Sequence, residues 1–178
     1  SGAMSTVKVD TIQHSGGTTG LTIDSSGRVS MPQVPAWRIG RSSNLTMTTG
    51  DTAVVTWNLD NSVADRMFLQ NVTHNSGTGK VTLPIAGIYI ISANIRFDSA
   101  GAADYVNARI AINDEEDSSN QTFAYGIDGE TPDTYISINL SETYNLAAND
   151  TVKIAVKASG DTSWSIQSRS SWSGHFVG

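Results

Sequence analysis

The segment Lys80–Asp98 restricts the fold of this chain more than any other. From Tyr89 to Phe97 the odd-numbered positions are all apolar, whereas the even-numbered positions end in serine, asparagine and arginine. Because side chains alternate between the two faces of a β-strand, this period of two predicts a strand with one continuous apolar face. Pro84 cannot donate to a central ladder and predicts a break before the strand. Gly87 can adopt the backbone angles that direct the chain into it.

The second face of this strand begins apolar, at Ile88 and Ile90, and turns polar from Ser92. A strand that packs on a single core needs only one apolar face. An apolar end on the other face indicates contact with a second layer or another subunit. We therefore predict a long, central, antiparallel strand whose outer end is covered.

The rest of the chain is also typical of β-structure. It is rich in Ser, Thr, Asn and Gly, only 16% of its residues are charged, and no segment carries the sustained apolar stripe of an amphipathic helix. Short strands separated by turn signals lie on both sides of the Lys80–Asp98 segment in the sequence. This spacing predicts a sandwich or barrel. The predicted strands are Ala36–Gly40, Asn44–Met47, Ala53–Leu59, Met67–Gln70, Tyr105–Asn113, Thr122–Ile127, Thr134–Leu146, Thr151–Ala158 and Trp172–Val177, with a loop at His74–Gly79.

The first 35 residues differ from the remainder. Ser1-Gly2-Ala3 reads as a cloning remnant before Met4, so residues 1–4 are set apart as remnant and start methionine. Residues 5–35 form a predicted hairpin or extended arm with a turn at Asp24–Gly27, followed by a proline-bracketed linker. This arm has too few apolar residues for its own core, so it docks, trimerises or stays partly disordered. Residues 36–178 form one domain in the 178-residue chain.

Charge and composition exclude several classes of partner. The net charge of −6 argues against nucleic acid or an anionic membrane as partner. No apolar run approaches the roughly 20 residues that cross a bilayer, so we expect no membrane insertion. The chain has no cysteine, which rules out disulfides and thiolate metal sites. No basic and apolar leader is visible, and we expect a protein made without a signal peptide.

Three blocks in order resemble the complement-one-q globular head family. They are Lys80-Val-Thr-Leu-Pro84-Ile-Ala-Gly87-Ile-Tyr89-Ile-Ile-Ser92, Leu146-Ala-Ala-Asn149-Asp150-Thr-Val152, in which Asn149 replaces the usual Gly, and Ser171-Trp-Ser-Gly174-His-Phe-Val177, in which Trp172 stands where Phe is common. Over residues 36–178 the resemblance implies the all-β, ten-stranded jelly-roll sandwich that this family shares with the tumour necrosis factor superfamily. It also implies a homotrimer, and the residues that we expect at its interface are Ile88, Ile90, Tyr105 and Tyr135.

The arm is similar to a different group of proteins. Met4-Ser-Thr-Val-Lys-Val-Asp-Thr-Ile-Gln13, followed by Gly-Gly-Thr-Thr-Gly-Leu-Thr-Ile-Asp-Ser-Ser-Gly-Arg-Val, resembles the N-termini of fibre and appendage proteins of marine cyanobacterial phages. The resemblance implies a protein on the surface of the virion, extracellular when it functions, with other virion proteins as partners.

Reaction chemistry has no clear site in the sequence. His14, His74 and His175 lie far apart, and solvated loop or strand positions are the ordinary interpretation of each. No Gly-x-Ser-x-Gly elbow occurs, and Gly77-Thr-Gly79-Lys80 lacks the spacing of a phosphate-binding loop. We therefore predict that the protein is not an enzyme and needs no cofactor.

Candidate binding residues lie in the predicted loops 98–104, 114–121 and 159–164, because loops on a rigid sandwich commonly carry recognition. The acidic turn 114–117 could hold Ca²⁺ with its carboxylates, although an ordinary solvated turn is the alternative. Most aromatic residues of a jelly roll lie in the core or an interface; among them Trp164 has little apolar company in sequence and is the best candidate for an exposed platform that stacks on a sugar. The candidate residues are Asp104, Asp114, Glu115, Glu116, Asp117, Asn120 and Trp164.

These observations lead to a hypothesis with alternatives. The leading hypothesis is a homotrimeric virion appendage, such as a tail fibre tip, whose loops bind a host-surface glycan or protein. The alternatives are a capsid or tail decoration protein without a receptor and a bacterial surface or secreted adhesion module. A glycan-degrading enzyme ranks last, because no pair of acids stands out.

Overall fold

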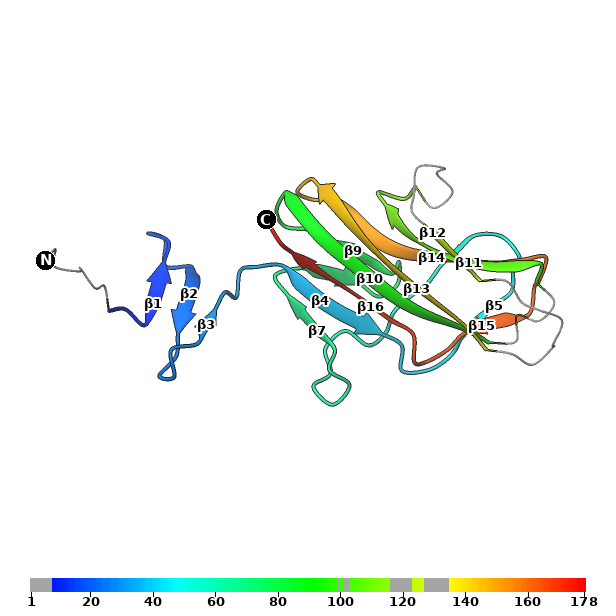
Figure 1. Ribbon diagram of the computed structural model, residues 1–178, viewed down its shortest axis with the longest axis horizontal. Helices are drawn as coiled ribbons and strands as arrows, with labels where there is room; N and C mark the ends of the chain where they lie inside the picture. The colour runs from blue at the N-terminus through cyan, green and yellow to red at the C-terminus, as the bar shows by residue number, and fades with distance from the viewer. Residues whose placement is uncertain (1–7, 99, 101–102, 116–122, 127–134) are drawn as a thin grey trace, which may run out of the picture.

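A computed structural model of the chain describes residues 8–98, 100, 103–115, 123–126 and 135–178, with only the backbone of 123–126. Figure 1 shows a small β-sheet at one end, joined by a single linker to a two-layered β-sandwich. The described residues contain no helix that is long and apolar enough to cross a membrane. The architecture is all-β, as the sequence predicted.

The larger sheet of the sandwich contains the strand on which the prediction rested. In the described chain its strands run in the order β5-β15-β10-β16-β4-β7, and β13 pairs with β10 as well. They are β4 (Ala36–Gly40), β5 (Leu45–Met47), β7 (Phe68–Gln70), β10 (Gly87–Asp98), β13 (Ile136–Leu146), β15 (Trp164–Ile166) and β16 (Ser171–Phe176).

The smaller sheet covers the inner face of the larger one. Its described strands run in the order β12-β11-β14-β9-β8, with β6 beside β14. They are β6 (Ala53–Val54), β8 (Thr73–Asn75), β9 (Lys80–Thr82), β11 (Tyr105–Ile112), β12 (Phe123–Gly126) and β14 (Thr151–Ser159).

The strand β10 is long, central and antiparallel to its partners, which confirms the prediction. It pairs with β13 along its length on one side and with β16 and β15 on the other. Its odd-numbered side chains from Tyr89 to Phe97 are all buried. Pro84 lies in the connection between β9 and β10, where the chain passes from the smaller sheet to the larger. Gly87 has φ 145°, and Phe176 and the carbonyl of Gly178 leave no room for a Cβ.

Aromatic side chains fill one end of the core between the sheets. The rings of Trp37 and Trp172 meet edge to face with centroids 5.5 Å apart, and Trp57 lies 6.5 Å from Trp172. Tyr89 packs against Trp37 on one side and Phe176 on the other. The backbone at Gly174 passes directly over the indole of Trp37, so that a Cβ at this position would lie 2.2 Å from a ring carbon. Large aromatic surfaces of this kind dominate the burial in a core.

The turn before β14 shows why an asparagine can stand where the resembling sequence block has a glycine. Asn149 has φ 70°, in the left-handed region that asparagine tolerates better than other non-glycine residues. Its neighbour Asp150 accepts a hydrogen bond from the backbone N–H of Ala147 at 2.8 Å and one from the Asn113 amide at 2.7 Å. These bonds hold the turn against the end of β11.

Three local predictions were wrong. Thr73–Asn75 forms strand β8 and pairs with β9, so the predicted loop that starts at His74 begins too early. The His74 side chain is fully buried and its Nδ1 lies 2.7 Å from Asp60 Oδ2, so it is not the solvated loop residue that we expected. The predicted strand at Ala53–Leu59 is regular only at Ala53–Val54, because Val55 and Trp57 turn into the core beyond the short pairing with β14.

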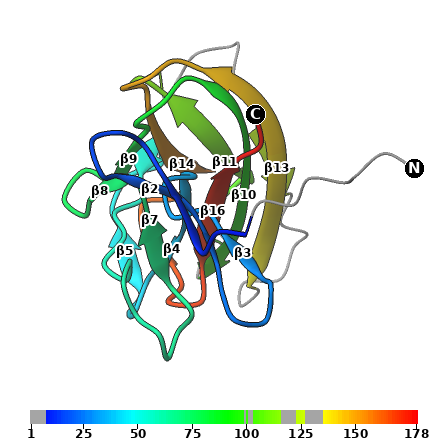
Figure 2. The same ribbon diagram turned by 90° about the vertical axis from the view of Figure 1, so that its left-hand side faces the viewer.

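The arm is a separate three-stranded sheet made of β1 (Thr11–Gln13), β2 (Thr19–Ile23) and β3 (Val29–Ser30). Figure 1 shows it standing clear of the sandwich, and Figure 2 views the molecule from the end at which the arm lies. In the turn between β2 and β3, Asp24 accepts backbone N–H bonds from Ser26 and Arg28, and Gly27 has φ 76°. The Gln70 amide donates to the carbonyl of Val34 at 2.6 Å, which ties the base of the arm to β7.

Candidate functional site

The outer face of the larger sheet is a broad surface with little charge. It consists of the side chains of β10, β13 and β16 that point away from the core, as the strand registers and the alternation of side chains define them. The chain has seventeen Asp and Glu residues, yet this face carries a single carboxylate, that of Asp98 at the end of β10. Its members are Ile88, Ile90, Ser92, Asn94, Arg96, Asp98, Ser137, Asn139, Ser141, Thr143, Asn145, Ser171, Ser173 and His175.

A depression of about 430 Å³ lies in the middle of this outer face. Short polar side chains line it, and they bond to each other across the strands. The hydroxyls of Ser92 and Ser141 lie 2.7 Å apart, and the Asn94 amide donates to the Asn139 Oδ1 at 2.5 Å. Side chains that already satisfy one another can be covered by another protein surface at small desolvation cost. The face is thus suited to contact with a neutral partner rather than to chemistry.

Three of the four predicted interface residues lie on this side of the molecule. Ile88 and Ile90 are half-buried at one end of the outer face, next to the chain terminus. Tyr135 is 50% exposed at the other end, and the Arg96 guanidinium lies over its ring, 3.9 Å from the centroid. Tyr105 starts β11 in the smaller sheet and points away from the core there, so the structure does not bring it to the other three.

The predicted binding loops divide into two places. Asp104 is exposed, its backbone N–H donates to the carbonyl of Ser159 at 2.9 Å, and its carboxylate lies beside Gly160. Asp104 and the described residues 159–160 therefore lie together at the end of the sandwich opposite the arm (Figure 1). Asp114 and the exposed Glu115 follow β11, whereas Asp104 precedes it. The length of that eight-residue strand, roughly 25 Å, separates them from the first group.

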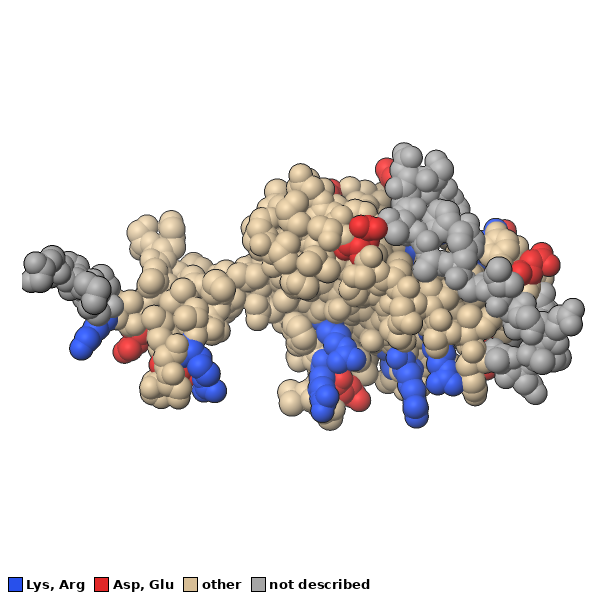
Figure 3. All heavy atoms as spheres, in the orientation of Figure 1, with Lys and Arg blue, Asp and Glu red and all other residues tan. Residues whose placement is uncertain are grey.

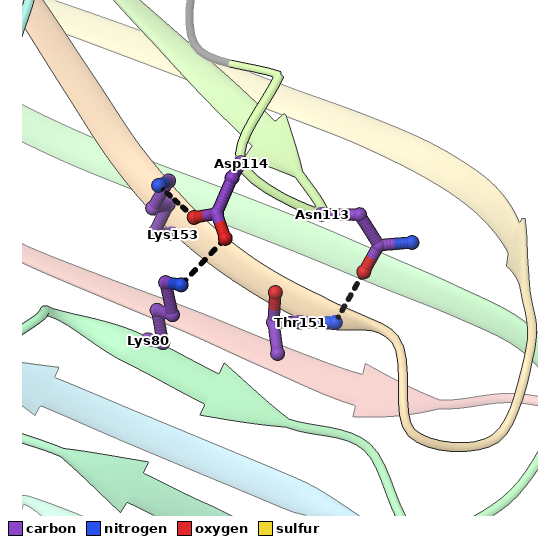
Figure 4. A network of polar contacts seen from close by, with 5 residues as sticks. All are labelled: Lys80, Asn113, Asp114, Thr151 and Lys153. Carbon is purple, nitrogen blue, oxygen red and sulfur yellow. Dashed lines mark hydrogen bonds and ion pairs between the residues drawn. The ribbon is translucent and has the colours of Figure 1, made fainter.

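Asp114 belongs to an ion-pair network. Figure 4 shows its carboxylate between the ammonium groups of Lys80 and Lys153, next to the hydrogen bond from the Thr151 N–H to the Asn113 side chain. The Lys80 contact is 2.7 Å long, and Lys153 is itself buried. The hydrogen bond from Lys153 and then that from Lys80 hold the pKa of Asp114 below its ordinary value. This carboxylate therefore pairs with two lysines at once.

The residues that the structure describes supply few ligands for the predicted calcium site. Within the part of the chain that the structure describes, no three His, Asp or Glu side chains form a group that could hold a metal ion. Asp114 is already committed to its lysines. The other candidates in this loop, Glu116, Asp117 and Asn120, lie outside the described residues.

Trp164 is not the exposed platform that the sequence suggested. It is 2% exposed, its ring stacks on Phe97 with centroids 5.5 Å apart, and its Nε1 donates to the carbonyl of Thr49 at 2.9 Å. The polar segment around it concealed this burial, because its apolar neighbours come from β10 and β5, far away in the sequence. The prediction of an exposed indole that stacks on a sugar is therefore wrong.

Comparison with known proteins bears on the fold. No protein-family model matches the chain, and no curated protein matches it. Among solved structures, it is similar to the Eiger tumour necrosis factor of S. frugiperda. The TM-score is 0.60 at 16% sequence identity, over 82% of this chain and 94% of that one. This similarity supports a jelly roll of the tumour necrosis factor type, which agrees with the three sequence blocks, and it does not extend to function.

Proposed function

We propose that the chain is a non-enzymatic, homotrimeric appendage protein on the surface of a phage particle, where it binds a molecule on the host surface. The observation that carries this proposal is the outer face of the larger sheet, which has few charged side chains and ends in the half-buried Ile88 and Ile90. Depletion of charged residues is a feature of protein–protein contacts. A second and a third copy are the partners that the resemblance to the complement-one-q globular head implies.

The arm supports an assembled state as well. None of the residues in its three strands is buried, and Ile12, Val29 and Met31 are each more than half exposed. A sheet this small is marginal in water without a partner. In the proposed assembly the arms of three copies cover one another, or they insert into another virion protein.

The arrangement along the long axis fits an appendage. The arm and the C-terminus lie at one end of the sandwich, and the loops that contain Asp104 and Gly160 lie at the other (Figure 1). In the proposed orientation the arm faces the particle and these loops face the host. The sheets between them give the loops a rigid support.

The proposal is tested with Ile90→Glu, which places a carboxylate in the outer face. Ile90 points away from the core, so the variant folds as a monomer, with an unchanged circular dichroism spectrum and about one third of the wild-type mass by light scattering. Val63→Glu is the matched control, since Val63 is 93% exposed and lies outside the outer face. We expect wild type and Val63→Glu to bind marine cyanobacterial cells saturably, and the monomer to bind more weakly because it has lost avidity. A well-folded wild-type trimer that binds no cells contradicts host attachment and leaves a decoration role.

A further inference from the structure

Three arginines meet in one depression of about 270 Å³. Arg38 lies on β4, Arg41 follows the end of that strand, and Arg169 lies in the turn between β15 and β16. Ser171 lines both this depression and the one in the outer face, so the two are neighbours. Figure 3 shows that most Lys and Arg side chains on the visible side of the sandwich gather along one edge, although the chain as a whole is acidic.

The positive charge of Arg41 has no counterion within the described chain. This side chain is buried, with only 8% exposed. Its Nε donates to the carbonyl of Ser43 at 2.9 Å and its Nη1 to the carbonyl of Thr56 at 2.5 Å, and both acceptors are neutral. Burial lowers the pKa of Arg41, but a guanidinium stays protonated in proteins. A buried charge that is not paired is costly, which indicates that an anion completes this environment.

Arg38 and Arg169 need a further explanation. A structural role, in which Arg41 ties the end of β4 to residue 56, accounts for the two bonds of Arg41. It does not account for the other two arginines, whose side chains make no hydrogen bond or ion pair with any residue that the structure describes. Two free guanidinium groups beside a buried one repel each other, and natural surfaces retain such arrangements where an anion binds.

The remaining lining of the depression suits an oxyanion. Ser42, Ser168 and Ser171 add hydroxyl groups, and a guanidinium presents two parallel donors to a carboxylate or a sulfate. One carboxylate, that of Asp65, lies at the exposed rim and accepts a hydrogen bond from the Ser62 hydroxyl at 2.6 Å. The volume is below that of a typical site for a drug-sized ligand and is sufficient for one charged group with part of a sugar ring.

We infer that this depression, the arginine pocket of Arg38, Arg41 and Arg169, binds the charged group of an acidic surface polysaccharide, either a uronate carboxylate or a sulfate ester. The inference rests on the proposed attachment to a host surface, and it gives the chemical class of the ligand. The ligand then binds at the basic edge of the sandwich and not at the acidic loops, which repel a polyanion.

The test is titration calorimetry of the full chain with dextran sulfate, polygalacturonate and neutral dextran at low salt. We expect one of the two polyanions to bind, the other to bind more weakly and neutral dextran not to bind. Hydrogen bonds to charged groups are strong, so Arg38→Gln and Arg169→Gln should each lower the affinity about tenfold. Asp65→Asn should raise it, because a repulsive charge is removed. Arg28→Gln in the arm makes the same change in net charge far from the pocket and should leave the affinity unchanged.

Two results overturn the inference: wild type binds neither polyanion, or Arg28→Gln weakens binding as much as the pocket variants do. Saturable binding to cyanobacterial cells, measured with the same proteins, separates this inference from the proposed function. If cells bind wild type and Arg38→Gln equally, attachment stands and the arginine pocket is wrong as its site. If cells do not bind while polyanion affinity depends on the arginines, the pocket stands and the attachment role is wrong.

Discussion

Replacement of Gly174 by alanine places a methyl group against the indole of Trp37. A Cβ built on the β16 backbone at this position lies between 2.2 and 2.8 Å from three atoms of that ring. Carbon atoms in contact are best separated by about 3.5–4.0 Å. The chain or the ring must therefore shift by about 1 Å or more.

The ring has no space into which it can move. Trp37 is 1% exposed and is held between Trp172, at 5.5 Å, and Tyr89, at 6.4 Å. Overpacking a close-packed core costs about 1–3 kcal/mol, and a rigid ring in a rigid cluster puts this case at the upper end. We expect Gly174→Ala to lower the free energy of unfolding by about 3 kcal/mol. In a chain of this size such a loss lowers the Tm by about 6–12 °C.

Urea and thermal unfolding followed by tryptophan fluorescence measure this change. Gly77→Ala is the matched control, because a Cβ there meets only the Asn75 side chain, at 3.4 Å. Adding Trp37→Phe to Gly174→Ala makes room for the methyl group, so the two substitutions should cost less together than the sum of their separate costs. A Gly174→Ala protein within about 0.5 kcal/mol of wild type would refute this account of the core.

Three further predictions concern the loops and ion pairs. Asn149→Ala should lower the free energy of unfolding in urea by on the order of 1 kcal/mol, because alanine tolerates the φ of 70° poorly. Asn149→Gly should be close to neutral, and equal losses for the two variants would contradict this explanation. Asp114→Asn should cost on the order of 1 kcal/mol at pH 7. Because the folded-state pKa of Asp114 is lowered, that difference should be lost as pH falls below about 4; a difference independent of pH would contradict the ion-pair role. Trp164→Phe should lose on the order of 1 kcal/mol with the bond to Thr49, and should leave glycan binding unchanged because the indole is buried.

Local patterns in the sequence predicted most of the fold. The alternation in β10, the break at Pro84 and the turn at Asp24–Gly27 each depend on a few consecutive residues, and the structure confirms all three. Alternation of this kind also singled out Ile88 and Ile90 as an apolar outer end; both are half-buried in the chain, and their place in a subunit interface stays a prediction. These features were accessible because strand periodicity and turn geometry are properties of neighbouring residues.

Features that depend on distant segments could not be predicted in this way. Trp164 has polar neighbours in sequence and apolar neighbours in space, and His74 finds Asp60 only after folding. The arginine pocket likewise joins residues 38 and 41 to residue 169, more than 120 positions away. The sequence did show two positive charges, Arg38 and Arg41, near the end of a predicted strand. The third arginine comes to lie beside them only through the register of β4 and β16.

The mass of the wild-type protein in solution tests the central claim most directly. Sedimentation equilibrium over a range of micromolar concentrations measures it without reference to shape. The account predicts a species of three times 18.9 kDa that persists on dilution and is lost in Ile90→Glu. A wild-type protein with a mass of 18.9 kDa throughout that range would contradict the proposed assembly, and with it the role assigned to the outer face of the larger sheet.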